Sequence, residues 1–341
     1  MITDLEPSRE STEILDWART RVDPALRAAV GTLPRSIRRI AGYHFGWWDS
    51  DERPTGHHCG KAIRPALTLL TAQACGGRDA AAAAIPAAVA IELAHNFSLL
   101  HDDVMDRDTI RRHRPTAWAV YGVNAAILVG DSLLTLAFDV LATAGGVRST
   151  DLTRRLGIAI QALVEGQAQD IFFERRMDVT PAECLSMLKL KTAPLFAGAG
   201  ACGVLAAGGA PAEVERYRRF GELLGLSFQL ADDLLGIWGD PTVTGKPAYA
   251  DLAVRKKSAP VVTALNSGTP AGSRLAELYR RPHLEPAALA DAARLVDEAG
   301  GRRWSQRQAD LFLSEALAEL RSGAADTDLA ALARLAARRT H

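Results

Sequence analysis

The sequence predicts an all-α fold, and three observations carry that prediction. Nearly half of the 341 residues are apolar (48%), which is ample for a sizeable core. The apolar residues recur at helical spacing almost throughout, and the charges within these runs tend to one face. Alternating runs typical of strands are hard to find. We therefore expect a bundle of about ten or more helices.

The predicted helices of the N-terminal half are mostly Ala/Leu-rich segments separated by turn residues. In order, they are Ile14–Val30, Arg64–Gln73, Ala80–Leu100 and Asn124–Ala144. The glycine pair Gly76-Gly77 separates the second from the third, and Gly145-Gly146 follows the fourth. Glycine pairs are strong turn signals, so the helices are expected to break there.

The C-terminal half continues the same pattern. Its main predicted helices are Leu152–Arg175, Pro181–Lys191 and Ala212–Gly236. Gly208-Gly209 precedes the last of these, and the turn-rich run Gly239–Pro247 follows it. No linker and no short-period repeat interrupts the chain. We expect one domain over residues 1–341, with residues 1–20 and 326–341 frayed.

Charge and cysteine content exclude several classes of protein. The formal net charge is zero, so no general affinity for nucleic acid or anionic membranes is expected. The four cysteines are widely spaced and a chain of this size needs no disulfides, which indicates a reducing cytoplasm. His57, His58 and Cys59 are neighbours but leave a tetrahedral zinc site incomplete.

Neither a leader nor a membrane span is expected. The first ten residues lack a basic region followed by an apolar core. The longest uncharged stretch, Ala193–Ala212, has the length of a span but contains five glycines and few large apolar side chains. A buried, tightly packed helix pair fits this composition better.

Two aspartate clusters carry the first chemical hypothesis. Asp102, Asp103 and Asp106 end a long apolar helix, and Asp102 and Asp106 lie one turn apart, about 6 Å from each other. Asp232 and Asp233 end a second apolar run. An isolated acidic helix end is usually solvated, but two of them in one bundle can face each other across a cavity. They would hold Mg²⁺ ions bridged by a diphosphate.

Cationic residues near predicted turns supply the complementary charge. Lys61 and Arg64 stand at a predicted helix start, where free N–H groups also favour anions. Arg pairs suit the forked geometry of phosphate binding. Further cations lie at Arg111-Arg112, Lys191, Lys246 and Lys256-Lys257. Acidic clusters and basic anchors along an apolar bundle describe a site for a phosphorylated, greasy substrate.

Five ordered segments then carry a family resemblance. They read GKAIRP, HNFSLLHDDVMDRDTIRRHRPT, EGQAQD, LKLKTAP and FQLADDLLGIWGDPTVTGKP. In this order and spacing they resemble the trans-isoprenyl diphosphate synthases, over roughly residues 60–260. The resemblance implies an all-α bundle, usually a homodimer, that condenses isopentenyl diphosphate with an allylic diphosphate. It also implies three Mg²⁺ ions bound with the diphosphate.

The resemblance assigns a role to each matching position. The implied metal-binding residues are Asp102, Asp103, Asp106, Asp232 and Asp233. Those for the allylic diphosphate are Arg111, Lys191, Lys246 and Lys256, with Gln167 and Asp170 on the adjoining helix. Those for isopentenyl diphosphate are Gly60, Lys61, Arg64, His95 and Arg112. Lys191, through its carbonyl, Thr192 and Gln229 would present partial negative charge to the nascent cation.

Three positions depart from the family pattern. Gly236 stands where the second aspartate motif usually has its third Asp, which is expected to weaken Mg²⁺ affinity without abolishing activity. Cys59 replaces a glycine, and the loop from Pro247 to Asp251 is not the commonest form.

Product length is expected to depend on the side chains beneath the first aspartates. Phe97 precedes Asp102 by five residues, roughly 7–8 Å along a helix. An aromatic there would floor the tunnel, with Ser98 and Ala94 leaving room beside it. Within the family this combination resembles enzymes making the C20 product, with C15 next.

Two alternatives remain from other classes of function. A class I terpene cyclase would need an Asn/Ser/Glu-type second metal motif and would not need Lys61, Arg64 and Arg112. A non-catalytic partner subunit should have lost metal ligands, and only Gly236 hints at that. A di-iron bundle would need Glu-x-x-His pairs, which the sequence lacks.

Overall fold

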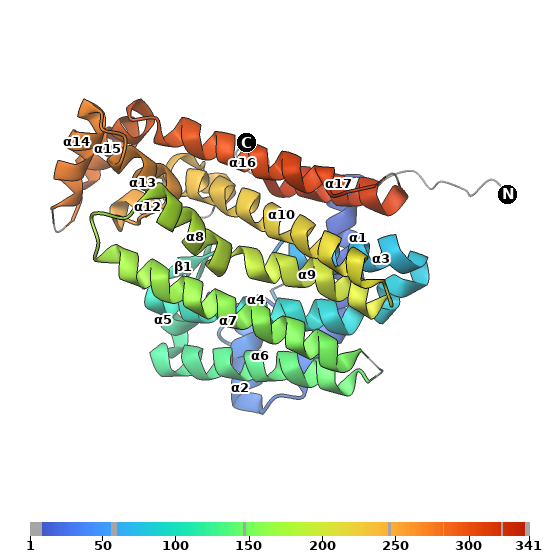
Figure 1. Cartoon of the computed structure of the whole chain (residues 1–341). Helices are drawn as coiled ribbons and strands as arrows, with labels where there is room; N and C mark the ends of the chain where they lie inside the picture. Colours follow the sequence, from blue (N-terminus) through green and yellow to red (C-terminus); the bar gives the residue numbers. More distant parts are fainter. Residues whose placement is uncertain are drawn as a thin grey trace. The chain divides into compact units, whose positions relative to one another are not determined.

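The structure is a computed structural model that describes residues 9–55, 60–145, 148–244, 247–281, 283–321 and 323–337. Within these ranges nearly all regular structure is helical, and the strands form one short antiparallel hairpin (Figure 1). The prediction of an all-α fold is confirmed. The hairpin was not predicted.

In chain order the elements are α1 (Ser11–Gly31), α2 (Arg35–His44), α3 (Ile63–Ala83), α4 (Ile85–Met105), β1 (Ile110–Arg111), β2 (Arg114–Pro115), α5 (Ala117–Tyr121), α6 (Val123–Thr143), α7 (Ser149–Glu174), α8 (Pro181–Lys191), α9 (Ala193–Ala206), α10 (Pro211–Trp238), α11 (Pro241–Thr244), α12 (Ala250–Ala253), α13 (Ala259–Leu265), α14 (Pro270–Tyr279), α15 (Pro286–Glu298), α16 (Gly301–Ala318) and α17 (Ala324–Ala337). The seven helices with predicted bounds are found as α1, α3, α4, α6, α7, α8 and α10, with shifts of a few residues at most ends.

The chain forms two compact units. Unit 1 comprises Met1–Ala159, Leu195–Gly221 and Leu320–Leu332. Unit 2 comprises Ile160–Pro194, Glu222–Glu319 and Ala333–His341. The single domain predicted over residues 1–341 stays a prediction. The segments expected to fray contain helix here, since α1 begins at Ser11 and α17 ends at Ala337.

Unit 1 is organised around α4. This helix packs along α6 and against α3 and α1. Leu93 and Leu100 of α4 and Leu67 and Leu70 of α3 are almost completely buried. A helix that is apolar around most of its circumference belongs in a core, so α4 delivers the first aspartate cluster from a rigid position.

A glycine breaks α3, close to where the sequence predicted a turn. Gly77 has a φ of 74°, in the left-handed region. Glycine has no Cβ, so it avoids the steric penalty that other residues meet there. Residues 80–83 belong to the end of α3, and α4 begins only at Ile85, with a proline in its first turn. The predicted helix Ala80–Leu100 was therefore too early at its start.

Small residues set the close packing of α9 in unit 1. A Cβ at Gly200 would lie 2.2 Å from the carbonyl oxygen of Tyr217, and one at Gly203 would lie 2.1 Å from that of Thr68. Backbone cannot yield by that much, so only glycine fits at both positions. The glycine-rich stretch thus serves helix packing, as the sequence indicated.

Unit 2 is built around the short helix α13, which packs against α8, α14, α15 and α16. One apolar cluster includes Ile237, Leu252, Val261 and Tyr279. A second cluster joins α8 and α10 through residues such as Met187, Leu188 and Leu230. These two clusters hold the C-terminal part of α10, which carries the second aspartate motif.

Among the described residues, α6 is long and apolar enough to cross a membrane, and α3 with α4 would count as a second such element if the bent pair were one span. Core helices of other proteins pass the same test of length and composition, so this finding is weak evidence for a span. The stretch Ala193–Ala212 contains only the shorter apolar helix Ala193–Ala206.

Candidate active site

The first aspartate cluster lies at the C-terminal end of α4. Asp102 is half-buried and Asp106, which caps the helix, is exposed. Carboxylates at a helix C-terminus meet the negative end of the helix dipole, which is unfavourable unless a cation is near. The position of Asp102 and Asp106 therefore favours cation binding.

Asp103 of this cluster faces inward and holds an arginine. Its side chain is 2% exposed, and Nε of Arg111 donates to its Oδ1 at 2.6 Å. Burial raises the pKa of Asp103 to about 6, and the guanidinium of Arg111 opposes that rise. Asp103 thus fixes Arg111, a candidate for diphosphate binding, on strand β1.

The hairpin places a second arginine beside Gly60. Arg111 pairs with Arg114 across the ladder, so Arg112 and His113 form a two-residue turn, with φ of 52° and 60°. A Cβ at Gly60 would lie 3.1 Å from Nη2 of Arg112. The structure therefore brings together Gly60 and Arg112, two of the residues predicted to bind isopentenyl diphosphate.

Arg64 and His95, two further members of that predicted set, are in direct contact. Nη1 of Arg64 lies 3.2 Å from Nε2 of His95. Arginine has no acceptor, so Nε2 accepts and the ring proton of neutral His95 sits on Nδ1. Burial, and then Arg64 and Arg112, lower the pKa of His95 well below its ordinary value. His95 is therefore a neutral donor, and Lys61 nearby in the chain is exposed.

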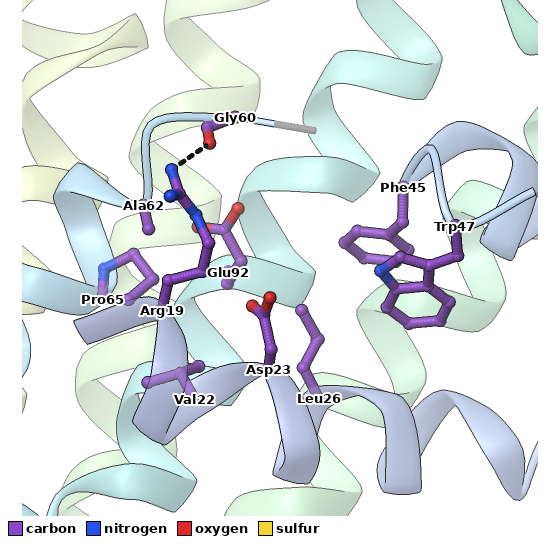
Figure 2. A pocket seen from close by; sticks show the side chains of 10 residues that line it. All are labelled: Arg19, Val22, Asp23, Leu26, Phe45, Trp47, Gly60, Ala62, Pro65 and Glu92. Atoms are coloured by element: carbon purple, nitrogen blue, oxygen red, sulfur yellow. Dashed lines mark hydrogen bonds between the residues drawn. The ribbon is translucent and has the colours of Figure 1, made fainter. Parts of the chain in front are cut away.

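Two hollows open in unit 1. The larger, about 430 Å³, is lined in part by Arg19, Asp23, Gly60 and Glu92 (Figure 2). Figure 2 shows the guanidinium of Arg19 bonded to the carbonyl of Gly60, with Phe45 and Trp47 on the opposite side. Of the predicted site residues that the structure describes, Gly60 alone lines this hollow.

The smaller hollow holds more of the predicted chemistry. It measures about 290 Å³, and its lining includes Asp103, Arg111, Arg112, Arg114 and His44. Three arginines around one hollow suit an anion with several oxygens. The smaller hollow thus holds Arg111 and Arg112, whereas Gly60, another predicted site residue, lines the larger one.

A buried hydrogen-bond chain links residues of the two hollows. The amide of Asn96 donates to Glu92 Oε1 at 3.1 Å, and its oxygen lies 3.1 Å from Nε2 of His44. Burial raises the pKa of Glu92 and lowers that of His44 to about 3. Both groups are thus held nearer their neutral forms, Glu92 on α4, the helix that also carries His95, and His44 at the end of α2.

The residues predicted to set product length lie on α4. Phe97, Ser98 and Ala94 are all buried, and the hydroxyl of Ser98 donates to the carbonyl of His95 at 2.8 Å. The ring of Phe97 meets that of His101 edge-on, with 4.8 Å between centroids. Phe97 is therefore held by a neighbour one turn nearer the aspartates.

In unit 2, α7 and α8 approach closely enough to pair Lys191 with Asp170. A Cβ at Gly166 would lie 2.3 Å from the backbone nitrogen of Lys191, so glycine permits the contact. Asp170, one turn further along α7, accepts from Nζ of Lys191 at 2.5 Å. Although burial opposes it, Lys191 with Lys256 holds the pKa of Asp170 below its ordinary value. Gln167 beside them is buried.

Thr192, Gln229 and Asp233 form a directed hydrogen-bond chain. The hydroxyl of Thr192 donates to Gln229 Oε1 at 2.7 Å, and Nε2 of Gln229 donates to Asp233 Oδ1 at 2.9 Å. The other carboxylate oxygen of Asp233 accepts from the backbone N–H of Ala259 at 2.9 Å. Asp233 is 2% exposed, whereas Asp232 beside it is exposed. The two aspartates thus point to different environments.

The other predicted cations and the His-Cys cluster lie in different surroundings. Lys246 lies outside the described residues, as do His57, His58 and Cys59. Burial raises the pKa of Asp233 to about 6, and the nearby Lys256 opposes that rise, as it also helps to hold the pKa of Asp170 down. Lys257 instead turns inward, with Nζ 3.8 Å from the sulfur of Met177.

Comparison with known proteins gives this geometry a family. Residues 53–296 match the polyprenyl synthetase family. The chain belongs to that family. It is 43% identical over 314 residues to (2E,6E)-farnesyl diphosphate synthase of Mycobacterium tuberculosis, covering 91% of this chain and 87% of the relative. It is 42% identical over 335 residues to geranylgeranyl diphosphate synthase of the same organism, covering 98% and 95%.

A solved polyprenyl synthetase has the same fold. The crystal structure from Streptomyces coelicolor A3(2) superimposes with a TM-score of 0.91 at 43% identity, covering 96% of this chain and 99% of that one. This polyprenyl synthetase is therefore a prenyltransferase of isoprenoid biosynthesis, with short-chain prenyl diphosphate synthase activity. The names of the two mycobacterial relatives favour condensation over the cyclase and partner-subunit alternatives.

Two contacts of this synthetase were not predicted from the sequence. Arg19 on α1 holds the carbonyl of Gly60, and Asp251 on α12 lies against Gly236. A lone arginine on an amphipathic helix is ordinarily read as solvent-facing. The only signal for Asp251 was the glycine itself, which left space for a neighbouring side chain.

Proposed function

We propose that this polyprenyl synthetase uses Mg²⁺ to condense isopentenyl diphosphate with an allylic diphosphate, and that its main product is geranylgeranyl diphosphate (C20). Farnesyl diphosphate (C15) is the second candidate. The supporting observation is the arrangement along α4. Asp102 and Asp106 end the helix, and the buried ring of Phe97 precedes Asp102 by five residues.

The donor set suits Mg²⁺. This ion favours one or two carboxylates together with phosphate oxygens and water, rather than an all-protein cage. Within the described residues no three His, Cys, Asp or Glu side chains converge as a ready-made metal site. The buried Oδ2 of Asp103 has no hydrogen-bond partner there, which leaves room for one more positive group. Asp102 and Asp106 of unit 1 would bind Mg²⁺, and so would Asp232 of unit 2, each within its own unit. The family pattern implies three ions in total.

The residues of the chain supply the remaining steps. When bound by these aspartates, Mg²⁺ would supply positive charge against the leaving diphosphate. The positive charge that the family pattern assigns to the allylic diphosphate is carried by Arg111 in unit 1 and by Lys191 and Lys256 in unit 2. Thr192 has donated its only hydrogen to Gln229, so its oxygen offers lone pairs to an allylic cation. Burial of Thr192 keeps competing water away from that oxygen.

The second substrate would bind to the cluster around Gly60. Lys61, Arg64 and Arg112 carry the positive charge, and neutral His95 adds a donor. These groups converge at the N-terminus of α3, where free N–H groups also favour an anion. The isopentenyl double bond then attacks the allylic carbon, and the proton lost afterwards passes to the departing diphosphate.

The test is incorporation of radiolabelled isopentenyl diphosphate with each allylic primer, with Mg²⁺ or with a chelator, followed by product sizing. We expect Mg²⁺-dependent C20 product. Asp102→Asn should abolish most of it, whereas Asp139→Asn, an exposed aspartate of α6, should not. Absence of incorporation with every primer would overturn the proposal, and a C15 product would overturn the chain length alone.

We also propose that the enzyme is a homodimer. Val123, Ile127 and Leu128 of α6 are exposed apolar side chains, at 43%, 37% and 58% of their surface. Such a stripe is costly in water and suits a second copy of the chain. Light scattering after gel filtration should give twice the chain mass, and Leu128→Glu should halve it.

A cytoplasmic location is the remaining part of the proposal. Cys75, Cys184 and Cys202 are free thiols, which suits a reducing compartment. Fractionation of the source cells with an antibody against the chain tests it, and recovery in the membrane fraction would contradict it.

A further inference from the structure

Gly236 leaves a gap in the second aspartate motif, and a carboxylate from another helix lies over it. Gly236 follows Asp232 by four residues on α10, so both positions share one helix face. A Cβ on Gly236 would lie 2.2 Å from Oδ2 of Asp251 and 2.8 Å from its Oδ1. The carboxylate of Asp251 therefore occupies the space that a side chain at position 236 would take.

The backbone around Asp251 holds that carboxylate in place. The N–H of Tyr249 donates to the carbonyl of Ile237 at 3.2 Å, which ties the start of α12 to the end of α10. Leu252 is fully buried in the same apolar cluster as Ile237. The carbonyl of Asp251 accepts from the N–H of Lys256 at 2.8 Å. Since α12 is anchored on both sides of Asp251, its position against Gly236 is set by the fold.

Asp233 cannot fill the gap. Both of its carboxylate oxygens accept internal hydrogen bonds, from Gln229 and from the backbone of Ala259, and its side chain is buried. Asp232 is exposed and Asp251 is half-buried. Asp232 and Asp251 thus each keep part of their surface open to solvent, whereas Asp233 does not.

We propose that Asp251 supplies the carboxylate that Gly236 lacks, so that Asp232 and Asp251 together bind the Mg²⁺ of the second aspartate motif. This inference rests on the proposed function, because the use of Mg²⁺ is itself part of that proposal. Side chains one helical turn apart stand about 5–6 Å from each other at Cβ. A Mg²⁺ ion with its bound water and diphosphate oxygens spans that separation.

The rival explanation is a purely structural Asp251. It lies in the first turn of α12, where a negatively charged side chain interacts favourably with the helix dipole. A structural role and a metal-binding role predict different outcomes when the carboxylate is moved from position 251 to position 236. Only a metal-binding role is satisfied by a carboxylate supplied from α10.

The experiment measures Mn²⁺ binding to the full chain by equilibrium dialysis with inorganic diphosphate, corrected by a protein-free blank. Four proteins are compared, namely the parent, Asp251→Asn, the swap Gly236→Asp/Asp251→Ala, and Asp310→Asn as a control. Asp310 is exposed on α16, and its substitution by Asn removes the same charge from unit 2. Circular dichroism and thermal unfolding verify that each variant is folded.

We expect Asp251→Asn to weaken Mn²⁺ binding about tenfold or more, the swap to recover most of that loss, and Asp310→Asn to match the parent. Unchanged binding by Asp251→Asn, or a folded swap as weak as Asp251→Asn, overturns the assignment. If the parent itself binds no Mn²⁺ with diphosphate, the proposed Mg²⁺-dependent function fails instead. The two failures are thus distinguishable.

Discussion

The hydroxyl of Thr192 donates to Oε1 of Gln229 at 2.7 Å, and this bond has only one possible direction. The amide nitrogen of Gln229 donates to Asp233, so its oxygen is the group that faces Thr192. A hydroxyl has a single hydrogen, which Thr192 has therefore committed. Its oxygen presents only lone pairs to any other neighbour, and lone pairs attract a developing carbocation.

We predict that Thr192→Val lowers kcat about 100-fold and leaves KM for isopentenyl diphosphate nearly unchanged, because the lost interaction is made only as charge develops. Steady-state kinetics with an allylic primer measures both constants. Thr263→Val is the matched control, since the buried Thr263 hydroxyl of α13 has no hydrogen-bond partner among the described residues. A kcat for Thr192→Val close to the parent value would contradict the role.

A second prediction concerns the contact between α7 and α8. Gly166→Ala should destabilise the protein by about 1–3 kcal/mol, because the added Cβ meets the backbone of Lys191 rather than a flexible side chain. It should also lower activity by displacing Lys191 from Asp170. Urea unfolding followed by circular dichroism measures the first effect.

The control lies on the same helix. A Cβ at Gly157 would meet nothing closer than Phe138 at 4.0 Å. Gly157→Ala should therefore stabilise α7, by about 0.5–1 kcal/mol, through the better helix propensity of alanine. Equal effects of the two substitutions would mean that close packing at Gly166 is not the cause.

The helices could be predicted because their cause is local. Periodic apolar residues and the capping pair Thr180 and Glu183 define α8, whose predicted bounds agree with the structure. The hairpin could not be predicted in the same way. Its turn residues Arg112 and His113 have positive φ, a conformation usually taken by Gly or Asn, so the sequence carried no turn signal there.

In the candidate site, too, local features were predictable and tertiary contacts were not. The residue types at Asp102 and Asp232 and their spacing were readable, because the motif is local. The burial of Asp103 and Asp233 was not, since their partners Arg111 and Ala259 come from other segments. The contact of Arg19 with Gly60, across 41 residues, is likewise a product of tertiary folding.

The lowered pKa of His44 leads to a prediction of how the stability of the protein depends on pH. Burial, and then Arg112 and Arg111, lower its pKa to about 3, so folding favours the neutral ring. A folded pKa below the unfolded value of about 6.5 gives stability that is fully present above pH 6.5 and is lost as pH falls toward 3. At pH 4.5 the expected loss is about 3 kcal/mol, from two pH units of linkage.

His44→Gln, which stays neutral, should remove this part of the acid sensitivity. Urea unfolding at several pH values between 7.5 and 4.5 gives the comparison. The stability of the parent relative to His44→Gln should fall with decreasing pH. Parallel profiles for parent and His44→Gln would argue against the assignment.

Arg19 is predicted to position the isopentenyl site without touching the reacting carbons. Arg19→Met keeps much of the side-chain volume but removes the bond to the Gly60 carbonyl, at 3.1 Å. Gly60, which lies beside Arg112, should then be held less firmly, raising KM for isopentenyl diphosphate about tenfold, the equivalent of 1.4 kcal/mol, with little change in kcat. Arg21→Met on the same helix serves as control, because the Arg21 side chain donates a hydrogen bond to the carbonyl of Trp17 on its own helix. A KM equal to that of the parent would exclude this role.

Phe97 gives the last prediction. Its ring is 6% exposed, rests against His101 and lies five residues before Asp102 on a rigid core helix. Ala94 and Ser98 beside it are small, so Phe97 is the one bulky side chain of the three. If it floors the product tunnel, Phe97→Ala opens the space beneath and lets the chain grow by further five-carbon units. Thin-layer sizing of radiolabelled products should show a shift beyond C20, while Phe172→Ala, at a residue 60% exposed on α7, should leave the product unchanged.

Removal of a buried ring costs about 3–5 kcal/mol, so the assays should be run well below the melting temperature of the variant. A folded, active Phe97→Ala enzyme with the parent's product length would show that another residue sets the limit.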